Sequence, residues 1–112
     1  MSLSFKTSNP QALLSAFKKA IDDEHIVTWS YDAAGDFTHT PPQWRYRAWL
    51  RPAIGLGELN LFMVPRKDSR ISSEEYAIYH GRYAEAMLAH FDRLFWECSA
   101  TAMPSLGDAM AA

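Results

Sequence analysis

Residues 72 to 96 read SSEEYAIYHGRYAEAMLAHFDRLFW, and the rest of the architecture follows from what this stretch must pack against. Ser72 and Glu75 have the Ser-x-x-Glu spacing of a capping box, which is typical of a helix start. Large apolar and aromatic residues then recur three and four positions apart, as on one face of a helix. The pattern predicts a helix that runs to about Trp96 or Glu97.

This predicted helix has an unusually wide apolar side, made of two neighbouring stripes. The first stripe is mostly aromatic and consists of Tyr76, Tyr79, His80, Tyr83, Met87, His90, Phe91 and Leu94. The second contains small residues and consists of Ala77, Gly81, Ala84, Leu88 and Phe95. We expect the first stripe to pack on a sheet and the second to receive another helix of the chain. The alternative is that part of the second stripe faces a second subunit.

The chain before this helix alternates between the two kinds of periodicity. Asn9 and Pro10 form a helix start, and apolar residues at helical spacing predict a helix over residues 10 to 24. Alternating or apolar runs separated by Gly and Pro then predict strands. These strands are expected over residues 26–31, 36–40, 44–51 and 58–64.

The predicted fold class is therefore α+β. A two-layer sandwich is the simplest arrangement, with a four-stranded antiparallel sheet that carries the N-terminal helix and the long C-terminal helix on one face. The element order is α-β-β-β-β-α. Residues 1–97 form the expected domain, and residues 98–112 form a flexible or loosely docked tail. Residues 1–8 are expected to be a loose leader.

Composition restricts the class of protein. The chain has 112 residues, a formal net charge of -2 and one cysteine, Cys98. A slightly acidic chain argues against a dedicated nucleic-acid-binding domain, and a single cysteine excludes an intrachain disulfide. The first residues lack the apolar core of a signal peptide, and no apolar run is long enough to span a membrane. We expect a cytoplasmic protein with no membrane contact.

No pattern for a metal, a cofactor or a nucleophile stands out. The four histidines include no His-x-x-x-His pair, and His80 and His90 are roughly 15 Å apart along one helix. Cys98 follows Glu97, which would raise its pKa, so a structural role is favoured. Gly55 and Gly57 suit a hairpin turn better than a phosphate loop. The sequence predicts neither a metal site nor a cofactor.

The segment from Trp44 to Arg51 is the strongest candidate for a binding surface. Alternation along a strand predicts one face formed by Arg45, Arg47, Trp49 and Arg51. Arginine and tryptophan are enriched at protein interfaces, and together they also suit anions or single-stranded nucleic acid. The alternative is a solvated strand face. Trp96 lies on the far side of the long helix and is a second candidate contact.

A competing hypothesis places a small-molecule site between the first hairpin and the C-terminal helix. The polar side chains that this site needs are Tyr31, Asp32, Asp36, His39, His80 and Arg82. If they converged in a pocket, they would form an acid–base set. The ordinary interpretation of Asp32 and Asp36 is that they stabilise a turn.

Two stretches resemble a group of small bacterial proteins of unassigned function. The first is Trp29-Ser30-Tyr31-Asp32 with Gly35-Asp36-Phe37-Thr38-His39-Thr40, and the second is Tyr79-His80-Gly81-Arg82 with His90-Phe91-Asp92. The resemblance covers about residues 10 to 97. The resemblance implies a stand-alone bacterial protein rather than a fragment of an enzyme. It implies no activity, ligand or partner.

The absence of a catalytic set favours a non-enzymatic binding or assembly protein. Surplus aromatic residues and the wide apolar side of the long helix favour contact with another protein or self-association as a homodimer. A small enzyme or ligand-binding protein is the alternative, and weak nucleic-acid or anion binding by the Arg-Trp segment is the second alternative.

Overall fold

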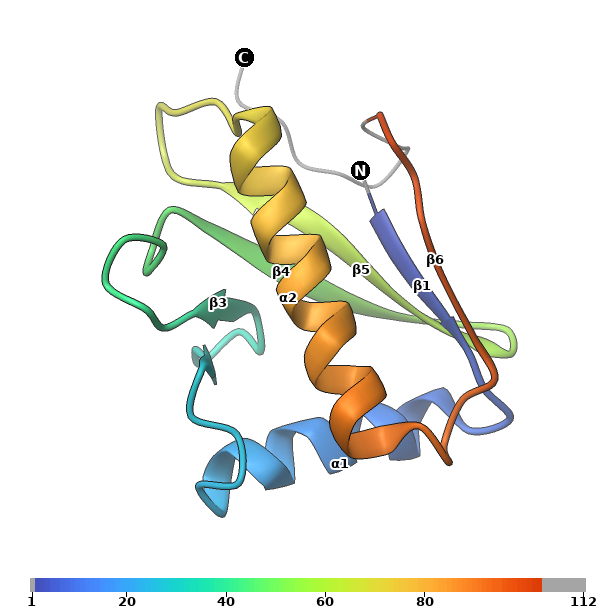
Figure 1. Cartoon of the computed structure of the whole chain (residues 1–112). Coiled ribbons are helices and arrows are strands. Elements are labelled where there is room, and N and C mark those ends of the chain that lie inside the picture. The colour runs from blue at the N-terminus through green and yellow to red at the C-terminus, as the bar shows by residue number, and fades with distance from the viewer. Residues whose placement is uncertain (1, 104–112) are drawn as a thin grey trace.

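The computed structural model describes residues 2–103. Two helices and six strands follow one another along this part of the chain (Figure 1). In chain order they are β1 (Ser2–Lys6), α1 (Pro10–Asp22), β2 (Trp29–Tyr31), β3 (Phe37–His39), β4 (Ala48–Gly55), β5 (Glu58–Pro65), α2 (Ser73–Phe91) and β6 (Glu97–Ala100).

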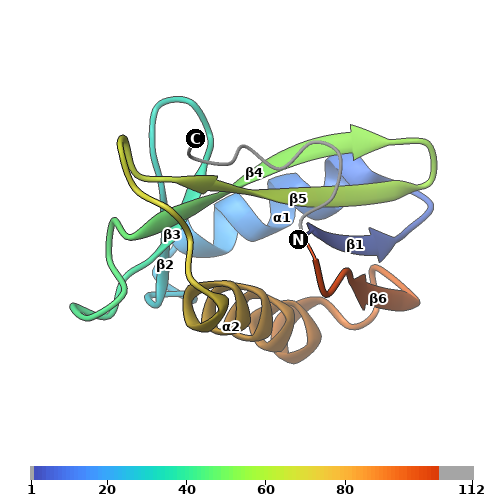
Figure 2. The same cartoon turned by 90° about the horizontal axis from the view of Figure 1, so that it is seen from above.

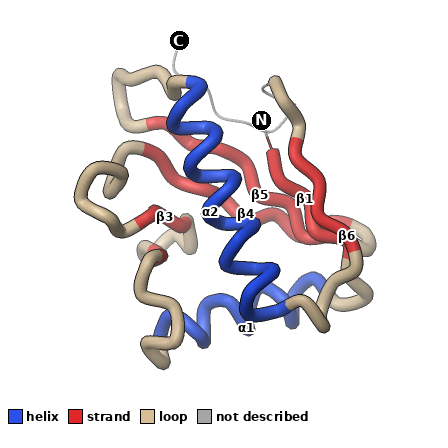
Figure 3. Tube along the Cα trace, in the orientation of Figure 1, coloured by secondary structure: helices blue, strands red, loops and turns tan. Residues whose placement is uncertain are grey.

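All the strands belong to one antiparallel sheet with the order β2-β3-β4-β5-β1-β6 (Figure 3). The expected α+β class with an antiparallel sheet and two helices is confirmed. The expected number of four strands is wrong, because the described residues form six. The two extra strands, β1 and β6, pair with each other at one side of the sheet.

The missed strands came from segments expected to be loose. In the segment Ser2 to Lys6, the alternate residues Leu3 and Phe5 are buried. The segment is too short for this alternation to distinguish a strand from a loose leader in the sequence. β6 contains no alternating pattern, and it forms because its backbone pairs with β1, far away in sequence. The first residues of the expected tail therefore belong to the sheet, and its part from residue 104 onward lies outside the described residues.

One hydrophobic core lies between the sheet and the helices. α1 packs against β4 and β5, and α2 packs against β1 and β4. Seen from above, α2 runs along one side of the molecule, and α1 lies on the side toward β4 and β5 (Figure 2). The sheet contributes the fully buried side chains Leu50, Leu59, Leu61 and Met63 to this core.

Aromatic rings fill the centre of the core. Phe17 of α1 stacks on Tyr83 of α2, with ring centroids 4.5 Å apart. Trp29 of β2 meets the edges of Tyr79 and Tyr83 at 5.7 and 5.1 Å. Such contacts stabilise beyond simple burial of area. They hold the short β2–β3 hairpin against the middle of α2.

The capping box predicted at the start of α2 is confirmed. The Ser72 hydroxyl accepts a hydrogen bond from the Glu75 N–H, and the Glu75 carboxylate accepts one from the Ser72 N–H. The helix ends at Phe91, earlier than expected. It ends there because the chain turns to bury Phe95 against Phe5, with ring centroids 5.2 Å apart, and to pair β6 with β1.

The second stripe of α2 is not covered by α1, contrary to expectation. α1 contacts α2 through Phe17, which packs on Tyr83 and Phe91 of the first stripe. Ala77 and Gly81 remain exposed, and the side chain of Leu88 is half exposed. This part of the helix faces outward.

The expected strand over residues 44–51 is also wrong in its bounds. Residues 42 to 47 form turns, in which Trp44 and Arg45 donate their N–H groups to the carbonyl of Pro41. Tyr46 has a positive φ of 60°, which a strand does not contain. β4 therefore starts at Ala48 and continues through Pro52. Because Pro52 lies beyond the end of β3, the N–H group that proline lacks is not needed for a hydrogen bond to that strand.

Candidate functional site

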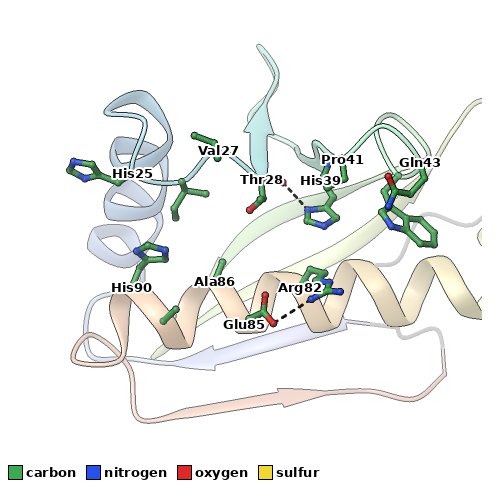
Figure 4. A pocket seen from close by; sticks show the side chains of 13 residues that line it. His25, Val27, Thr28, His39, Pro41, Gln43, Arg82, Glu85, Ala86 and His90 are labelled. Atoms are coloured by element: carbon green, nitrogen blue, oxygen red, sulfur yellow. Dashed lines mark hydrogen bonds and ion pairs between the residues drawn. The ribbon is translucent and has the colours of Figure 1, made fainter.

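A cleft of about 420 Å³ separates the β2–β3 hairpin from α2 (Figure 4). One wall is the chain on either side of the hairpin, residues 25–28 and 39–44. The other wall is the side of α2 from Arg82 to His90. We refer to this space as the hairpin cleft. Its size is typical of pockets for small molecules.

The hairpin is shaped by its own turn. The Asp32 carboxylate accepts hydrogen bonds from the N–H groups of Ala34 and Asp36, and Gly35 has a φ of +86°. Beyond the strands, Thr40 continues the pairing by donating its N–H to the carbonyl of Thr28 and its hydroxyl to the carbonyl of Val27. These bonds fix the wall of the cleft that carries His39.

His39 is the most constrained polar side chain of the cleft. Its Nδ1–H donates to the carbonyl oxygen of Thr28 at 2.7 Å, and its ring lies 4.7 Å from that of Trp29. From there the ring points toward α2 (Figure 4). Burial lowers the pKa of His39, and the positive charge of Arg82 lowers it further, although the Thr28 carbonyl and Glu85 oppose this shift. The imidazole is therefore favoured in its neutral form.

Arg82 and Glu85 face His39 from α2. One guanidinium nitrogen of Arg82 lies 3.4 Å from a carboxylate oxygen of Glu85, and both side chains are more than half exposed. Such an exposed ion pair contributes little to stability, so either partner can rearrange. The cleft therefore presents an exposed cation and an exposed anion opposite a buried, neutral imidazole.

The far end of the cleft is lined by His25, which follows α1, and by His90 near the end of α2 (Figure 4). Apolar atoms of Ile26, Ala86 and Trp44 line the space between the polar groups. The cleft thus combines polar and apolar surface, as binding sites for organic molecules do.

Only two residues of the predicted acid–base set line this cleft, namely His39 and Arg82. Asp32 stabilises the hairpin turn, and Asp36 is buried in an ion pair with Arg51. His80 is buried and hydrogen-bonded to the carbonyl of Tyr76.

Tyr31, the remaining member of the predicted set, donates its hydroxyl to Asp22 of α1. The set as a whole does not converge. Strand alternation turns Asp36 to the face opposite His39, whereas Tyr31, on the same face as His39, is directed to α1.

The predicted binding surface is not one continuous strip. Arg45 and Arg47 lie in the turns before β4, over the rings of Tyr46 and Trp44. Trp49 and Arg51 share a face of β4, but the guanidinium of Arg51 is engaged by Asp36.

Trp96 lies apart from these residues, between α2 and β6. Its side chain is 69% exposed.

Sequence reasoning did not connect Gln43, Trp44, Glu85, His25 and His90 with this site. They come from three separate segments, and no spacing rule relates them. The only signal in the sequence was that the chain has four histidines, which lie around the hairpin and toward the end of α2.

Two further findings concern residues 2–103. No group of three or more His, Cys, Asp and Glu side chains in this range is arranged to hold a metal ion. No helix in the same range has the length and apolar character needed to cross a membrane.

The chain matches no protein-family model, no curated protein and no solved structure.

Proposed function

We propose that this protein binds a small organic anion, such as a carboxylate, in the hairpin cleft. The observation that carries this proposal is the placement of the Arg82 cation and the neutral His39 imidazole on opposite walls of one cleft. The volume of about 420 Å³ suits a metabolite-sized molecule.

Arg82 supplies the charge that an anion needs. A guanidinium carries several N–H donors in a planar fork that matches a carboxylate. The guanidinium of Arg82 makes a long contact of 3.4 Å with the carboxylate of the exposed Glu85. A ligand carboxylate could displace Glu85 at little cost, because exposed ion pairs of this kind are weak.

The apolar lining favours an organic anion over a bare inorganic ion. Trp44 offers an aromatic surface, and Ile26 and Ala86 offer aliphatic surface, within the same cleft as Arg82. Burying an apolar ligand body against these side chains adds binding free energy in proportion to the area removed from water.

The test is a titration with benzoate and, separately, with inorganic phosphate, followed by amide chemical shifts. We expect benzoate to shift residues of the hairpin cleft and to bind more tightly than phosphate. Arg82→Gln should weaken benzoate binding by roughly tenfold or more, as for the loss of a charge-assisted hydrogen bond.

Arg93→Gln is the matched control, because it removes the same charge just beyond the end of α2 from an exposed residue that does not line the cleft. It should leave benzoate affinity close to that of the wild type. Equal effects of the two substitutions, or shifts that map elsewhere on the molecule, would contradict the proposal.

We also propose self-association through the β6 side of the molecule as a second candidate. β6 is an edge strand, so one row of its backbone groups faces away from the sheet. Trp96, which precedes it, is 69% exposed. An antiparallel pair of identical edge strands has the two-fold symmetry of most homodimers.

Sedimentation velocity over a concentration series tests this candidate. If β6 mediates a dimer, Trp96→Ser should shift the protein toward the monomer. Val27→Ser is the matched control, since Val27 is 70% exposed just before β2, which forms the opposite edge of the sheet from β6. A monomer at all concentrations for the wild type would rule self-association out.

A further inference from the structure

We infer that the anion bound in the hairpin cleft also carries a hydrogen-bond donor, an O–H or N–H group, and that Nε2 of His39 accepts it. This inference rests on the proposed function and narrows its ligand to donor-bearing organic anions.

The tautomer of His39 is set by its backbone partner. A carbonyl oxygen can only accept, so the 2.7 Å contact with Thr28 places the ring proton on Nδ1. The same carbonyl accepts the N–H of Thr40, which holds it in place. In the neutral ring, Nε2 then carries a lone pair and acts as an acceptor.

The surroundings of His39 keep this acceptor available. Trp29 and Tyr79 pack against the ring, with centroids 4.7 and 6.2 Å away. The Tyr79 hydroxyl is directed to the Thr38 hydroxyl and to the carbonyl of Trp44 instead of to the ring of His39. Among residues 2–103, no donor is hydrogen-bonded to Nε2.

The charged groups that face His39 both come from α2. Arg82 disfavours a protonated imidazole and Glu85 favours one, and burial adds to the effect of Arg82. A neutral His39 cannot attract an anion by charge. His39 therefore contributes selectivity, because its Nε2 atom favours a ligand that donates a hydrogen bond.

The cleft should consequently discriminate between two anions of equal charge. A ligand without a donor covers Nε2 and removes it from water without replacing the lost hydrogen bond, which is unfavourable. A ligand with a suitably placed hydroxyl replaces that bond. We expect about a fivefold difference in dissociation constant, as for one neutral hydrogen bond.

The experiment compares benzoate with its three hydroxybenzoate isomers and with the corresponding methoxybenzoates. The three isomers cover three separations between carboxylate and hydroxyl. A methoxy group accepts hydrogen bonds but cannot donate them, so it controls for size. At least one hydroxybenzoate should bind about fivefold more tightly than benzoate and its methoxy partner, as the acceptor role of Nε2 requires.

Two measurements assign that preference to His39. In the wild type, the bound hydroxybenzoate should shift the Nε2 nitrogen resonance toward that of a hydrogen-bonded nitrogen, whereas benzoate should not. His39→Asn keeps a donor for the Thr28 carbonyl and removes the Nε2 acceptor, so the preference should disappear while benzoate still binds. If this variant does not fold, the nitrogen resonance of the wild type decides.

The outcomes separate the two proposals. If benzoate, hydroxybenzoates and methoxybenzoates bind in the cleft with equal affinity, the role of His39 is refuted and anion binding stands. If no aromatic carboxylate binds in the cleft, both are refuted.

Discussion

The Nδ1–H group of His39 donates a hydrogen bond to the carbonyl oxygen of Thr28, and this contact fixes the tautomer and orientation of a buried imidazole. Burial lowers the pKa of His39, with Arg82 adding to the shift. In the unfolded chain His39 titrates near its ordinary value of about 6.5. Protonation of His39 should therefore oppose folding.

The sign of the pH dependence follows from proton uptake on unfolding. Above pH of about 6.5, His39 is neutral in both states and costs no stability. As the pH falls below that value toward the lower pKa of the folded state, only the unfolded chain binds the proton. The free energy of unfolding from urea denaturation should then decrease more steeply in the wild type than in His39→Asn. Equal slopes in the wild type and in His39→Asn would contradict this effect of His39.

Tyr79 and Tyr83 allow the same substitution to be compared in two environments. The Tyr79 hydroxyl is hydrogen-bonded to Thr38 and Trp44. The Tyr83 hydroxyl is buried without a hydrogen-bond partner among residues 2–103, and burial raises its pKa well above the ordinary value. Tyr79→Phe should lower the free energy of unfolding by about 1–2 kcal/mol, whereas Tyr83→Phe should leave it unchanged or raise it by up to about 1 kcal/mol.

Chemical denaturation of both variants at neutral pH measures this contrast. Each substitution removes one oxygen from a buried ring, so the loss of volume is the same. Equal destabilisation of the two variants would mean that the Tyr83 hydroxyl has a partner in solution, and the different environments of the two hydroxyls would then have no energetic consequence.

Gly57 and Gly81 form a second matched pair, because an added Cβ would meet no atom within 4 Å at either position. Gly57 has a φ of +71° in the β4–β5 turn, whereas Gly81 lies inside α2. Gly57→Ala should cost about 1 kcal/mol, because L-residues avoid positive φ. Gly81→Ala should raise the free energy of unfolding by about 0.5–1 kcal/mol through helix propensity.

Thermal unfolding of the two alanine variants gives the sign of each effect directly. A destabilising Gly81→Ala would indicate that the exposed stripe of α2 is covered by a partner under the conditions of the measurement. The same experiment at high and low protein concentration would then reveal that partner as a second copy.

Local signals explain which elements were predictable. The Asn9-Pro10 start of α1 and the Ser72–Glu75 box of α2 act within one helical turn, and both are present in the structure. β6 has no such signal, because its formation depends on pairing with β1 about ninety residues earlier. Arg45 and Arg47 alternate like strand residues but belong to turns. These turns form because the N–H groups of Trp44 and Arg45 donate to the carbonyl of Pro41.

The candidate site was also predictable only in part. His39 and Arg82 were recognised as polar residues flanking the hairpin and the long helix, and both line the hairpin cleft. Asp36 was grouped with them, but strand alternation turns it to the opposite side. There it meets Arg51, which the sequence assigned to a separate surface.

The ion pair between Asp36 and Arg51 therefore has a structural role at the junction of β3 and β4. The guanidinium donates to both carboxylate oxygens at 3.2 and 3.0 Å, and Asp36 is only 6% exposed. β3 and β4 share a single ladder pair, Phe37 with Leu50, so the ion pair reinforces a narrow connection. Arg51→Met keeps the aliphatic stem but leaves a buried carboxylate, which should cost about 2 kcal/mol in urea denaturation.

The double variant Asp36→Leu/Arg51→Met should be more stable than Arg51→Met alone. Replacing both partners by apolar groups removes the uncompensated charge, whereas replacing one creates it. Arg47→Met is the control, since Arg47 forms no ion pair among the described residues and should change stability by less than about 0.5 kcal/mol. Strictly additive effects of the two substitutions would instead mean that Asp36 and Arg51 act independently, and the hairpin would then be held in place by its aromatic contacts with α2 alone.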